Sequence, residues 1–480
     1  MAVRDDEIAG LDATAQAALI SKGEVSSLEL VDVAIARIEQ ANPATNAIVS
    51  KTYDDARQWA QSPKLPKGPF RGVPFAFKDL GAHQKGMPYC LGNKALKAID
   101  HRASNDSVLG TRFRKAGLIT LGVTHAPELG NESSTVPEAH GTCRNPWNLK
   151  YSALGSSAGS AAAVACGMLP LAHGNDGGGS IRMPASWCGV VGLKPSRGRL
   201  PATPGHLINR RAVEFALTRS MRDTATLLDA VNGATNADLF QLPLPKRPFV
   251  EALKAPTAGL RIGVMTQGPG GITVHPECQR GLQRTVTCLT ELGHHVEENW
   301  PDALTKAREG VYQTVGSAFI RLDLKHIEDL LGRPLTQDDV GSYNWHCAGF
   351  DSPTATGLDL FLALESDQQW STEILQWWQQ DYDVLLTPTV AIPPWKNADL
   401  RQVANTDYAS IDADNLLVGA FTSPFNVTGQ PAISLPLHWT EDGLPVGMQL
   451  VADMGREDIL IQLGAQLEQA MPWCDRKPLL

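Results

Sequence analysis

Three glycines stand directly before a serine in the stretch GNDGGGSIRMPASWCG, residues 174–189. A glycine run loses much backbone entropy and favours neither a helix nor a strand. It does leave backbone N–H groups bare, so that several of them can approach one atom. Acyl transfer requires a nucleophile together with donors for the developing oxyanion. We therefore expect Ser180 to be a nucleophile whose oxyanion is held by N–H groups of Gly177, Gly178, Gly179 and Ser180.

Two other interpretations of this glycine run are a tight turn and a phosphate-binding loop. Taken alone, such a run is more typical of a tight turn. A phosphate-binding P-loop requires the pattern G-x-x-x-x-G-K-[ST], which is absent here.

A second serine cluster, YSALGSSAGSAAAVA at 151–165, contains the pattern G-x-S-x-G around Ser157. This pattern is typical of the nucleophile elbow of α/β-hydrolases, which must follow a strand. The preceding residues, NPWNLKYSAL, do not form an apolar run. The sequence therefore favours Ser180 over Ser157 as the nucleophile.

The nucleophile needs a base, and Lys78 ends the apolar stretch GVPFAF. A lysine at the end of a strand is usually a solvated charge. Burial would instead lower its pKa and allow the neutral amine to act as a general base. A serine–histidine–aspartate arrangement stays open from spacing alone, with His140 and His173 nearest to Ser180 in sequence.

The surrounding elements indicate an α/β protein. A capping box, Ser26 with Glu29, begins a predicted helix over 26–42. Apolar runs predict strands within 68–80, 118–125, 258–265, 381–390 and 430–437, with helices between them. Alternating strands and helices favour a mixed or largely parallel sheet in one large domain.

The segment 340–380 differs because it contains Trp345, Trp370, Trp377 and Trp378 and few strand signals. We expect a helical layer whose tryptophans pack in the core. Part of this layer could also wall a substrate pocket.

Bulk properties exclude several classes of protein. The formal net charge is −9 and no basic patch stands out, so we expect no nucleic-acid partner. No secretory leader and no membrane-spanning apolar run are visible. The eight cysteines are scattered without C-x-x-C spacing, which favours reduced thiols in a cytoplasmic protein and indicates no metal site.

Four blocks together resemble the amidase signature family, in the family's order and over nearly the whole chain: GVPFAFKD, GSSAGSAAAVA, GNDGGGSIRMPASWCGVVGLKPSRGR and FNVTGQPAISLPL. The resemblance implies one amidase domain over residues 1–480. Its mixed central β-sheet would be flanked by helices on both faces. The catalytic core would cover about 68–200, and a pocket-forming helical region about 300–380.

The family resemblance also implies roles for individual residues. Ser180 would be the nucleophile, Ser156 a bridging serine after a cis peptide bond, and Lys78 the base, while Ser157, Asp176 and Arg182 would support them. The spacing agrees, since 78 residues separate Lys78 from Ser156 and 24 separate Ser156 from Ser180. The chain would be an amide hydrolase that forms an acyl-enzyme on Ser180, without a cofactor.

Several stretches, among them ELGNES at 128–133, are similar to the branch of the family that hydrolyses 6-aminohexanoate cyclic dimer. This similarity implies a small cyclic or linear amide as substrate, with Asn131, Gly316, Phe319 and Trp345 as pocket residues. Aryl-acylamidase or carbamate hydrolysis, a tRNA-dependent amidotransferase subunit and an inactive binding protein on the same fold stay as alternatives. A homodimer is expected only because dimers are the commonest oligomers.

Overall fold

The computed structural model describes residues 7–133, 138–202, 211–255, 257–306, 311–350, 355–397 and 408–478. Its strands are β1 (Ile48–Lys51), β2 (Pro74–Lys78), β3 (Ile119–Thr124), β4 (Leu171–Asp176), β5 (Val191–Lys194), β6 (Val213–Thr218), β7 (Arg261–Val264), β8 (His295–Glu298), β9 (Val384–Pro388), β10 (Ala432–Trp439) and β11 (Pro445–Ala452). The longer helices within these ranges are α2 (Ala13–Ser21), α3 (Ser27–Thr45), α4 (Tyr53–Ala60), α6 (Val108–Lys115), α7 (Ala158–Ala165), α8 (Arg182–Cys188), α9 (Met221–Val231), α11 (Pro276–Glu291), α12 (Val311–Leu331), α14 (Gly357–Leu375), α15 (Tyr408–Gly419) and α17 (Glu457–Ala470). Shorter helical segments are α5 (Lys94–Ala98), α10 (Phe249–Ala252), α13 (Ser342–Cys347) and α16 (Pro424–Thr428).

The strands form two adjoining sheets. One has the order β4-β6-β5-β10-β11-β9-β7-β8, and the other has the order β1-β3-β2. Pairing is antiparallel from β4 across to β9 and parallel among β9, β7 and β8, which confirms the predicted mixed sheet. The predicted strands within 68–80 and 118–125 pair in parallel as β2 and β3.

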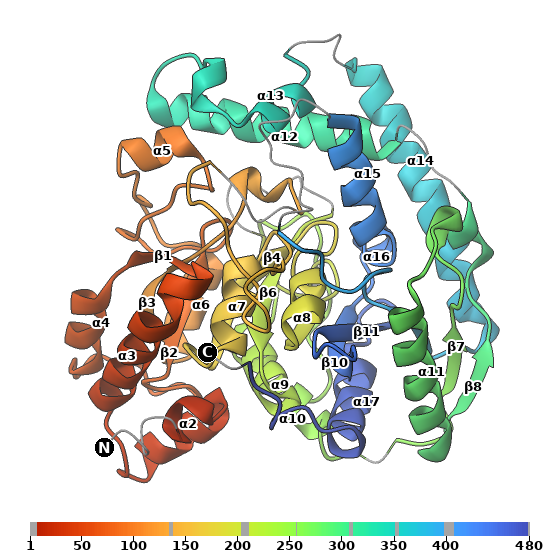
Figure 1. The fold of residues 1–480 in the computed structure, drawn as a ribbon, viewed down its shortest axis with the longest axis horizontal. Coiled ribbons are helices and arrows are strands. Elements are labelled where there is room, and N and C mark those ends of the chain that lie inside the picture. The colour runs from red at the N-terminus through yellow and green to blue at the C-terminus, as the bar shows by residue number, and fades with distance from the viewer. Residues whose placement is uncertain are drawn as a thin grey trace.

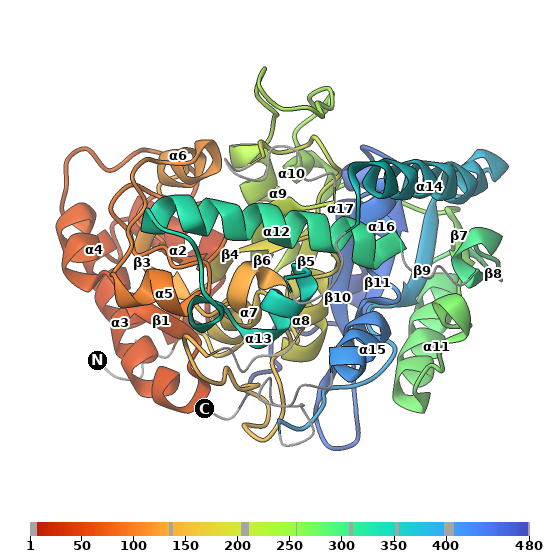
Figure 2. The ribbon, with the colours of Figure 1, turned by 90° about the horizontal axis from the view of Figure 1, so that it is seen from above.

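Helices cover both faces of the larger sheet, as expected (Figures 1 and 2). Helices α7 and α8 pack together on one face, with α8 against β5, β10 and β11. Helices α9, α11 and α17 pack on the other face, and α12 and α14 pack against each other (Figure 2). Burial of apolar surface on both faces provides the main stabilisation of such a sheet.

Local sequence signals explain why individual elements begin where they do. The predicted capping box is formed, because the Ser26 N–H donates to Glu29 Oε2 (2.7 Å) and the Glu29 N–H donates to Ser26 Oγ (3.2 Å). Helix α3 then buries an apolar stripe consisting of Leu30, Val31, Ala34, Ile35 and Ile38. Its periodicity is the one the sequence predicted.

The two sheets meet where β2 lies beside β4, and this junction positions the residues of interest. The Lys78 N–H at the end of β2 donates to His173 Nδ1 on β4 (3.3 Å). The carboxyl ends of both strands thus lie close together, with Lys78 on one and the glycine loop after Asp176 on the other. Helix α8 begins directly after this loop.

The tryptophans of 340–380 lie mainly in the core. Trp370, Trp377 and Trp378 belong to or pack against the main hydrophobic cluster, and the Trp377 indole donates to Asn299 Oδ1 (2.7 Å). Trp345 instead packs against a second cluster, which includes Leu80 and Leu129.

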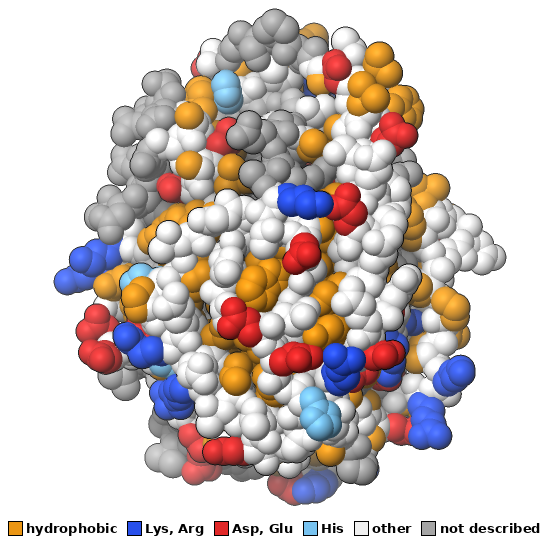
Figure 3. Space-filling model, turned by 90° about the vertical axis from the view of Figure 1, so that its right-hand side faces the viewer, with side chains coloured by type: hydrophobic (Ala, Val, Ile, Leu, Met, Phe, Trp, Pro, Cys, Tyr) orange, Lys and Arg blue, Asp and Glu red, His pale blue; other side chains and the backbone are white. Residues whose placement is uncertain are grey.

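No helix among the described residues is long and apolar enough to cross a membrane. On the face shown in Figure 3, acidic and basic side chains are interspersed rather than gathered by sign.

Candidate active site

Lys78 is completely buried at the end of β2, as the apolar stretch before it predicted. Its Nζ donates to Ser156 Oγ and to Asn175 Oδ1, both at 2.6 Å. Burial lowers the pKa of Lys78 from 10.5 to about 7, although the charges of Glu214 and Asp176 raise it. A large fraction of the amine is therefore neutral near pH 7, which a general base requires.

Ser156 follows a cis peptide bond from Gly155, the backbone form that the family resemblance implied. The Gly155 N–H donates to Ser133 O (2.8 Å), which ties this bend to the segment 128–133. Gly130 in that segment has a φ of 64°, and a Cβ there would lie 3.0 Å from Ser156 Oγ. Only glycine combines this backbone conformation with such a close approach.

Ser180 lies beside the cis-peptide bend, because its carbonyl accepts from the Ser157 N–H (3.3 Å). Ser180 is largely buried but keeps 9% of its residue surface exposed, against 2% for Ser156 and none for Lys78. Of these three groups, Ser180 is therefore the one that solvent and a small molecule reach most readily.

The glycine loop is held through its carbonyl groups. Gly178 O accepts from Thr422 Oγ1 (2.7 Å) and Ser423 Oγ (2.9 Å), and Gly179 O accepts from the Met183 N–H (2.7 Å). The N–H groups of Gly177, Gly178, Gly179 and Ser180 donate no hydrogen bond to the part of the chain that the structure describes. A loop anchored by its carbonyls with free N–H groups suits an anion at this place.

Gly179 is the glycine of this loop whose backbone most clearly needs its residue type. Its φ is 138°, and a Cβ would lie 2.3 Å from Thr422 Oγ1. A larger residue would have to displace the threonine that holds Gly178 O.

Asp176 and Arg182 form a buried pair beneath the loop. Arg182 Nε and Nη2 each donate to one Asp176 carboxylate oxygen at 2.9 Å, and neither side chain is exposed. Burial alone would raise the pKa of Asp176, but the charge and hydrogen bonds of Arg182 outweigh it and lower that pKa to about 2. The remaining Arg182 donors bond Thr422 O, Gln449 Oε1 and Asn426 Oδ1.

The alternative nucleophile and bases have other partners. Ser157 is fully buried, and its hydroxyl donates to Asn175 O (3.3 Å). His140 Nε2 lies 2.9 Å from Asp79 Oδ2, and both ring nitrogens of His173 are occupied, by the Lys78 N–H and by Glu214. The geometry therefore favours Lys78 over either histidine as the base.

The expected pocket residues differ in their surroundings. Asn131 is next to Gly130, and its Nδ2 donates to Asn344 Oδ1 on α13 (2.9 Å). A Cβ on Gly316 in α12 would meet nothing within 4 Å. Phe319, one turn further, is half-buried. The Trp345 ring packs against Phe350 with centroids 4.3 Å apart.

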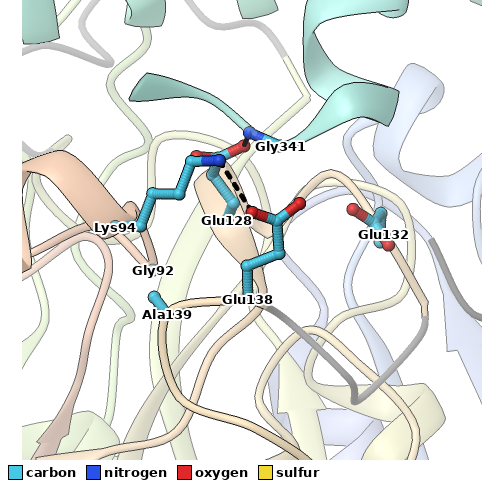
Figure 4. Close-up of a pocket in the computed structure, with 7 residues that line it drawn as sticks. All are labelled: Gly92, Lys94, Glu128, Glu132, Glu138, Ala139 and Gly341. Atoms are coloured by element: carbon cyan, nitrogen blue, oxygen red, sulfur yellow. Dashed lines mark hydrogen bonds and ion pairs between the residues drawn. The ribbon is translucent and has the colours of Figure 1, made fainter. Parts of the chain in front are cut away.

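A small pocket lies along the segment 128–133 (Figure 4). Its lining residues are Gly92, Lys94, Glu128, Glu132, Glu138, Ala139 and Gly341. Lys94 Nζ pairs with Glu138 (2.7 Å), and Glu128 accepts from Asn93, Asn344 and the Gly341 N–H. The same segment borders Ser156 through Gly130, but Lys78, Ser156 and Ser180 are not among the residues that line this pocket.

Several residues that form hydrogen bonds to the candidate site were not predicted from the sequence. Asn175 contacts Lys78 Nζ, while Thr422 and Ser423 fix Gly178 O. Asn426 donates to both the backbone and the side-chain oxygens of Asp176. Asn175 and Asn426 stand inside the blocks GNDGGGS and FNVTGQP, which were the available signal.

No group of three or more histidine, cysteine, aspartate or glutamate side chains suited to a metal ion occurs among the described residues. The polar side chains of the candidate site include Lys78, Ser156 and Asn175 together with the buried Asp176–Arg182 pair, and the serine and lysine groups are suited to acyl transfer through hydrogen bonds.

Comparisons with known proteins point to the same family as the sequence blocks. The family model for Amidase matches residues 29–461. The chain is 40% identical to the 6-aminohexanoate-cyclic-dimer hydrolase of Paenarthrobacter ureafaciens, over 98% of this chain and 96% of that protein. It is 35% identical to an acylamidase of Rhodococcus erythropolis, over 98% and 97% of the two chains.

A solved structure agrees with these sequence comparisons. A structure of 6-aminohexanoate cyclic dimer hydrolase matches with a TM-score of 0.94 and 39% identity, covering 98% of this chain and 99% of that one. The match extends over the single α/β domain described above.

Proposed function

The chain belongs to the amidase family and is a hydrolase of carbon–nitrogen bonds other than peptide bonds, and from this premise we propose that Ser180 is its nucleophile, with Ser156 and Lys78 as proton relay. The contact that carries the proposal is the 2.6 Å distance between Lys78 Nζ and Ser156 Oγ. It joins a buried amine of lowered pKa to the serine beside Ser180.

The proposed reaction begins with neutral Lys78. Its amine takes the proton of the Ser156 hydroxyl, and Ser156 takes the proton of Ser180 as Ser180 Oγ bonds to the amide carbonyl carbon. When the C–N bond breaks, the proton returns from Lys78 through Ser156 to the leaving amine. Water then attacks the acyl-enzyme by the same relay, releases the carboxylic acid and restores Ser180.

The glycine loop is proposed as the oxyanion hole. The N–H groups of Gly177, Gly178, Gly179 and Ser180 are the candidate donors, and losing one such donor typically slows catalysis 100- to 1000-fold, a range of about 2.7–4 kcal/mol. Asp176 and Arg182 support this role, because they anchor the loop from below. Ser157 supports it from the side through its N–H on Ser180 O.

The proposed substrate is a small cyclic or linear amide such as 6-aminohexanoate cyclic dimer or its oligomers. The named activity of the 40% identical relative supports this choice, and the acylamidase relative supports an aryl or acyl amide as the alternative. Asn131, Gly316, Phe319 and Trp345 are proposed as pocket residues. The pocket-forming region would then be the helical part of about 300–380, placed over a catalytic core of about 68–200.

Location and assembly are further parts of the proposal. All eight cysteines are free, which supports a reducing, cytoplasmic setting. A homodimer is proposed on the frequency of that assembly alone, with neither a nucleic-acid nor a membrane partner.

The test is amine release from 6-aminohexanoate cyclic dimer by the wild type and by Ser180→Ala, Ser156→Ala and Lys78→Ala. Ser104→Ala is the matched control, because Ser104 is an exposed serine far from the loop in sequence. We expect full activity in the control and a loss of more than about 1000-fold in Ser180→Ala.

Substantial activity in Ser180→Ala would contradict the assignment of the nucleophile. If the wild type instead cleaves only anilides or carbamates, the cyclic-amide substrate is rejected and the triad stands. A mass increase of Ser180 equal to the acyl group would identify the intermediate directly.

A further inference from the structure

Asn415 on α15 reaches the cis-peptide bend through the segment 128–133. Its Oδ1 accepts from the Ser133 N–H (3.0 Å) and from the Ser133 hydroxyl (2.6 Å). The Ser133 carbonyl in turn accepts from the Gly155 N–H (2.8 Å), directly before Ser156. A continuous chain of hydrogen bonds therefore runs from α15 to the residue that precedes Ser156.

The cis-peptide bend and this segment also touch along their backbones. A Cβ on Gly155 would lie 2.6 Å from Glu132 O and 3.1 Å from Ser133 O. Because no space separates the two backbones, a displacement of Ser133 is passed on to Gly155 and Ser156. The place of Ser156 Oγ, 2.6 Å from Lys78 Nζ, thus depends on the place of Ser133.

The amide of Asn415 is half-buried and has a fixed orientation. A backbone N–H can only donate, so the atom that meets the Ser133 N–H is the amide oxygen. Asn415 Nδ2 donates to the Tyr343 hydroxyl on α13 (3.1 Å), which donates its own proton to Asp412 Oδ1 (2.6 Å). Both ends of the amide therefore have matching partners, and such a network holds its side chains in one arrangement.

The same face of α15 leads to the glycine loop. Gly419 follows Asn415 by four residues, and residues at this spacing are neighbours on one face of a helix. The Gly419 carbonyl accepts from the N–H groups of Thr422 (3.1 Å) and Ser423 (2.8 Å), in the turn between α15 and α16 (Figure 1). The hydroxyls of these two residues bond Gly178 O. One helix and the turn after it therefore hold both the cis-peptide bend and the glycine loop.

We propose that Asn415 is a positioning residue for the relay, because it fixes the bend that carries Ser156 through its two hydrogen bonds to Ser133. The bend then stays in place beside the glycine loop, so that the Ser156 hydroxyl can pass a proton between Ser180 and Lys78. The inference rests on the proposed function, since it takes Ser156 as the bridge of the relay. It gives α15, which follows the pocket-forming region in the chain, a role in the chemical step.

The test measures acylation by p-nitrophenyl acetate, a small activated ester, so that the rate needs no knowledge of the natural substrate. Ser180 Oγ bonds to the acetyl carbon, the serine proton passes to Ser156, and p-nitrophenolate leaves. The burst of p-nitrophenolate gives the rate, and peptide mass spectrometry locates the acetyl group on Ser180. Asn415→Leu keeps a similar volume but removes both hydrogen bonds to Ser133. We expect its acylation rate to fall about tenfold, within the range for two lost hydrogen bonds.

Asn42→Leu is the matched control. Asn42 is another half-buried helical asparagine, on α3, and it exchanges two hydrogen bonds with the backbone of Ile48 (2.9 and 2.7 Å). Its replacement should lower stability in urea unfolding to a similar extent but leave the acylation rate at the wild-type value. Asn415→Asp keeps an oxygen for both Ser133 donors and should recover most of the rate that Asn415→Leu loses. An unchanged rate in Asn415→Leu, an equal fall in the control, or no recovery in Asn415→Asp overturns the proposal.

Two further variants show whether Asn415 acts through the bend. In a Ser156→Ala background, Asn415→Leu should change the acylation rate by less than about twofold, because the group that it positions is gone. A further tenfold fall there would contradict the proposal.

Ser133→Ala removes only the hydroxyl bond to Asn415 and serves if Asn415→Leu does not fold. Its rate should fall about two- to tenfold, the range for one lost hydrogen bond, and an unchanged rate counts against the proposal. A wild type that acquires no acetyl group on Ser180 refutes the proposed nucleophile, and with it the premise. Normal acetylation that is insensitive to Asn415 refutes the inference alone.

Discussion

Replacing Lys78 with methionine should alter how the stability of the protein depends on pH. Burial lowers the pKa of Lys78 from 10.5 to about 7 in the folded protein. Between these two values the unfolded chain holds a proton that the folded protein releases. The lysine therefore disfavours folding at pH 7, and the wild type gains stability as the pH rises towards 10.5.

The magnitude follows from the size of this shift. Each pH unit within the window is worth about 1.36 kcal/mol, and about half of that applies just above pH 7, where the folded lysine is half protonated. From pH 7 to pH 9 the free energy of unfolding of the wild type should rise by about 2 kcal/mol relative to Lys78→Met. The variant also loses the hydrogen bonds to Ser156 and Asn175, but that loss is nearly constant with pH.

The assay is urea unfolding of both proteins at pH 7, 8 and 9. Lys64→Met is the control, because Lys64 is exposed and its ammonium group is in water in both states. The difference between wild type and control should stay constant. A constant difference between wild type and Lys78→Met, by contrast, would refute the argument, because it would mean that Lys78 is protonated in the folded protein at pH 9.

Three further predictions concern activity and stability. The rate of amide hydrolysis should fall about tenfold for each pH unit below about 7, because only neutral Lys78 accepts a proton. Measurement of kcat/KM from pH 5 to pH 9 checks this expectation, and a flat profile contradicts it. Gly179→Ala should lower kcat at least tenfold, because the new Cβ would displace Thr422 from the loop. An unchanged kcat in steady-state assays would show that the loop adapts to the larger residue. Asp176→Asn should destabilise the fold by about 3–5 kcal/mol, because it leaves the Arg182 charge buried without its carboxylate. Urea unfolding at neutral pH measures this loss of stability, and a change under about 1 kcal/mol contradicts the prediction.

Local signals in the sequence were sufficient to predict the elements and the candidate triad. Apolar runs and caps depend on neighbouring residues, so the helix after Ser26 and the strands that became β2, β7, β9 and β10 could be predicted. The serine–glycine blocks and the lysine after GVPFAF also stand in contiguous stretches. They indicated Lys78, Ser156 and Ser180, which the structure brings into one region through the contact of Lys78 with Ser156 and of Ser180 O with Ser157.

The sequence by itself thus determined the fold class, the family and the candidate residues for the chemistry, because each is written in a continuous pattern. The tertiary structure alone decided which groups surround them. His173 on β4 accepts from the Lys78 N–H and contacts Glu214 on β6. Thr422 and Ser423 hold Gly178 from more than 240 positions away. Such contacts depend on strand order and sheet register, which no local pattern encodes. The lowered pKa of Lys78 has the same origin, since it follows from complete burial between two sheets.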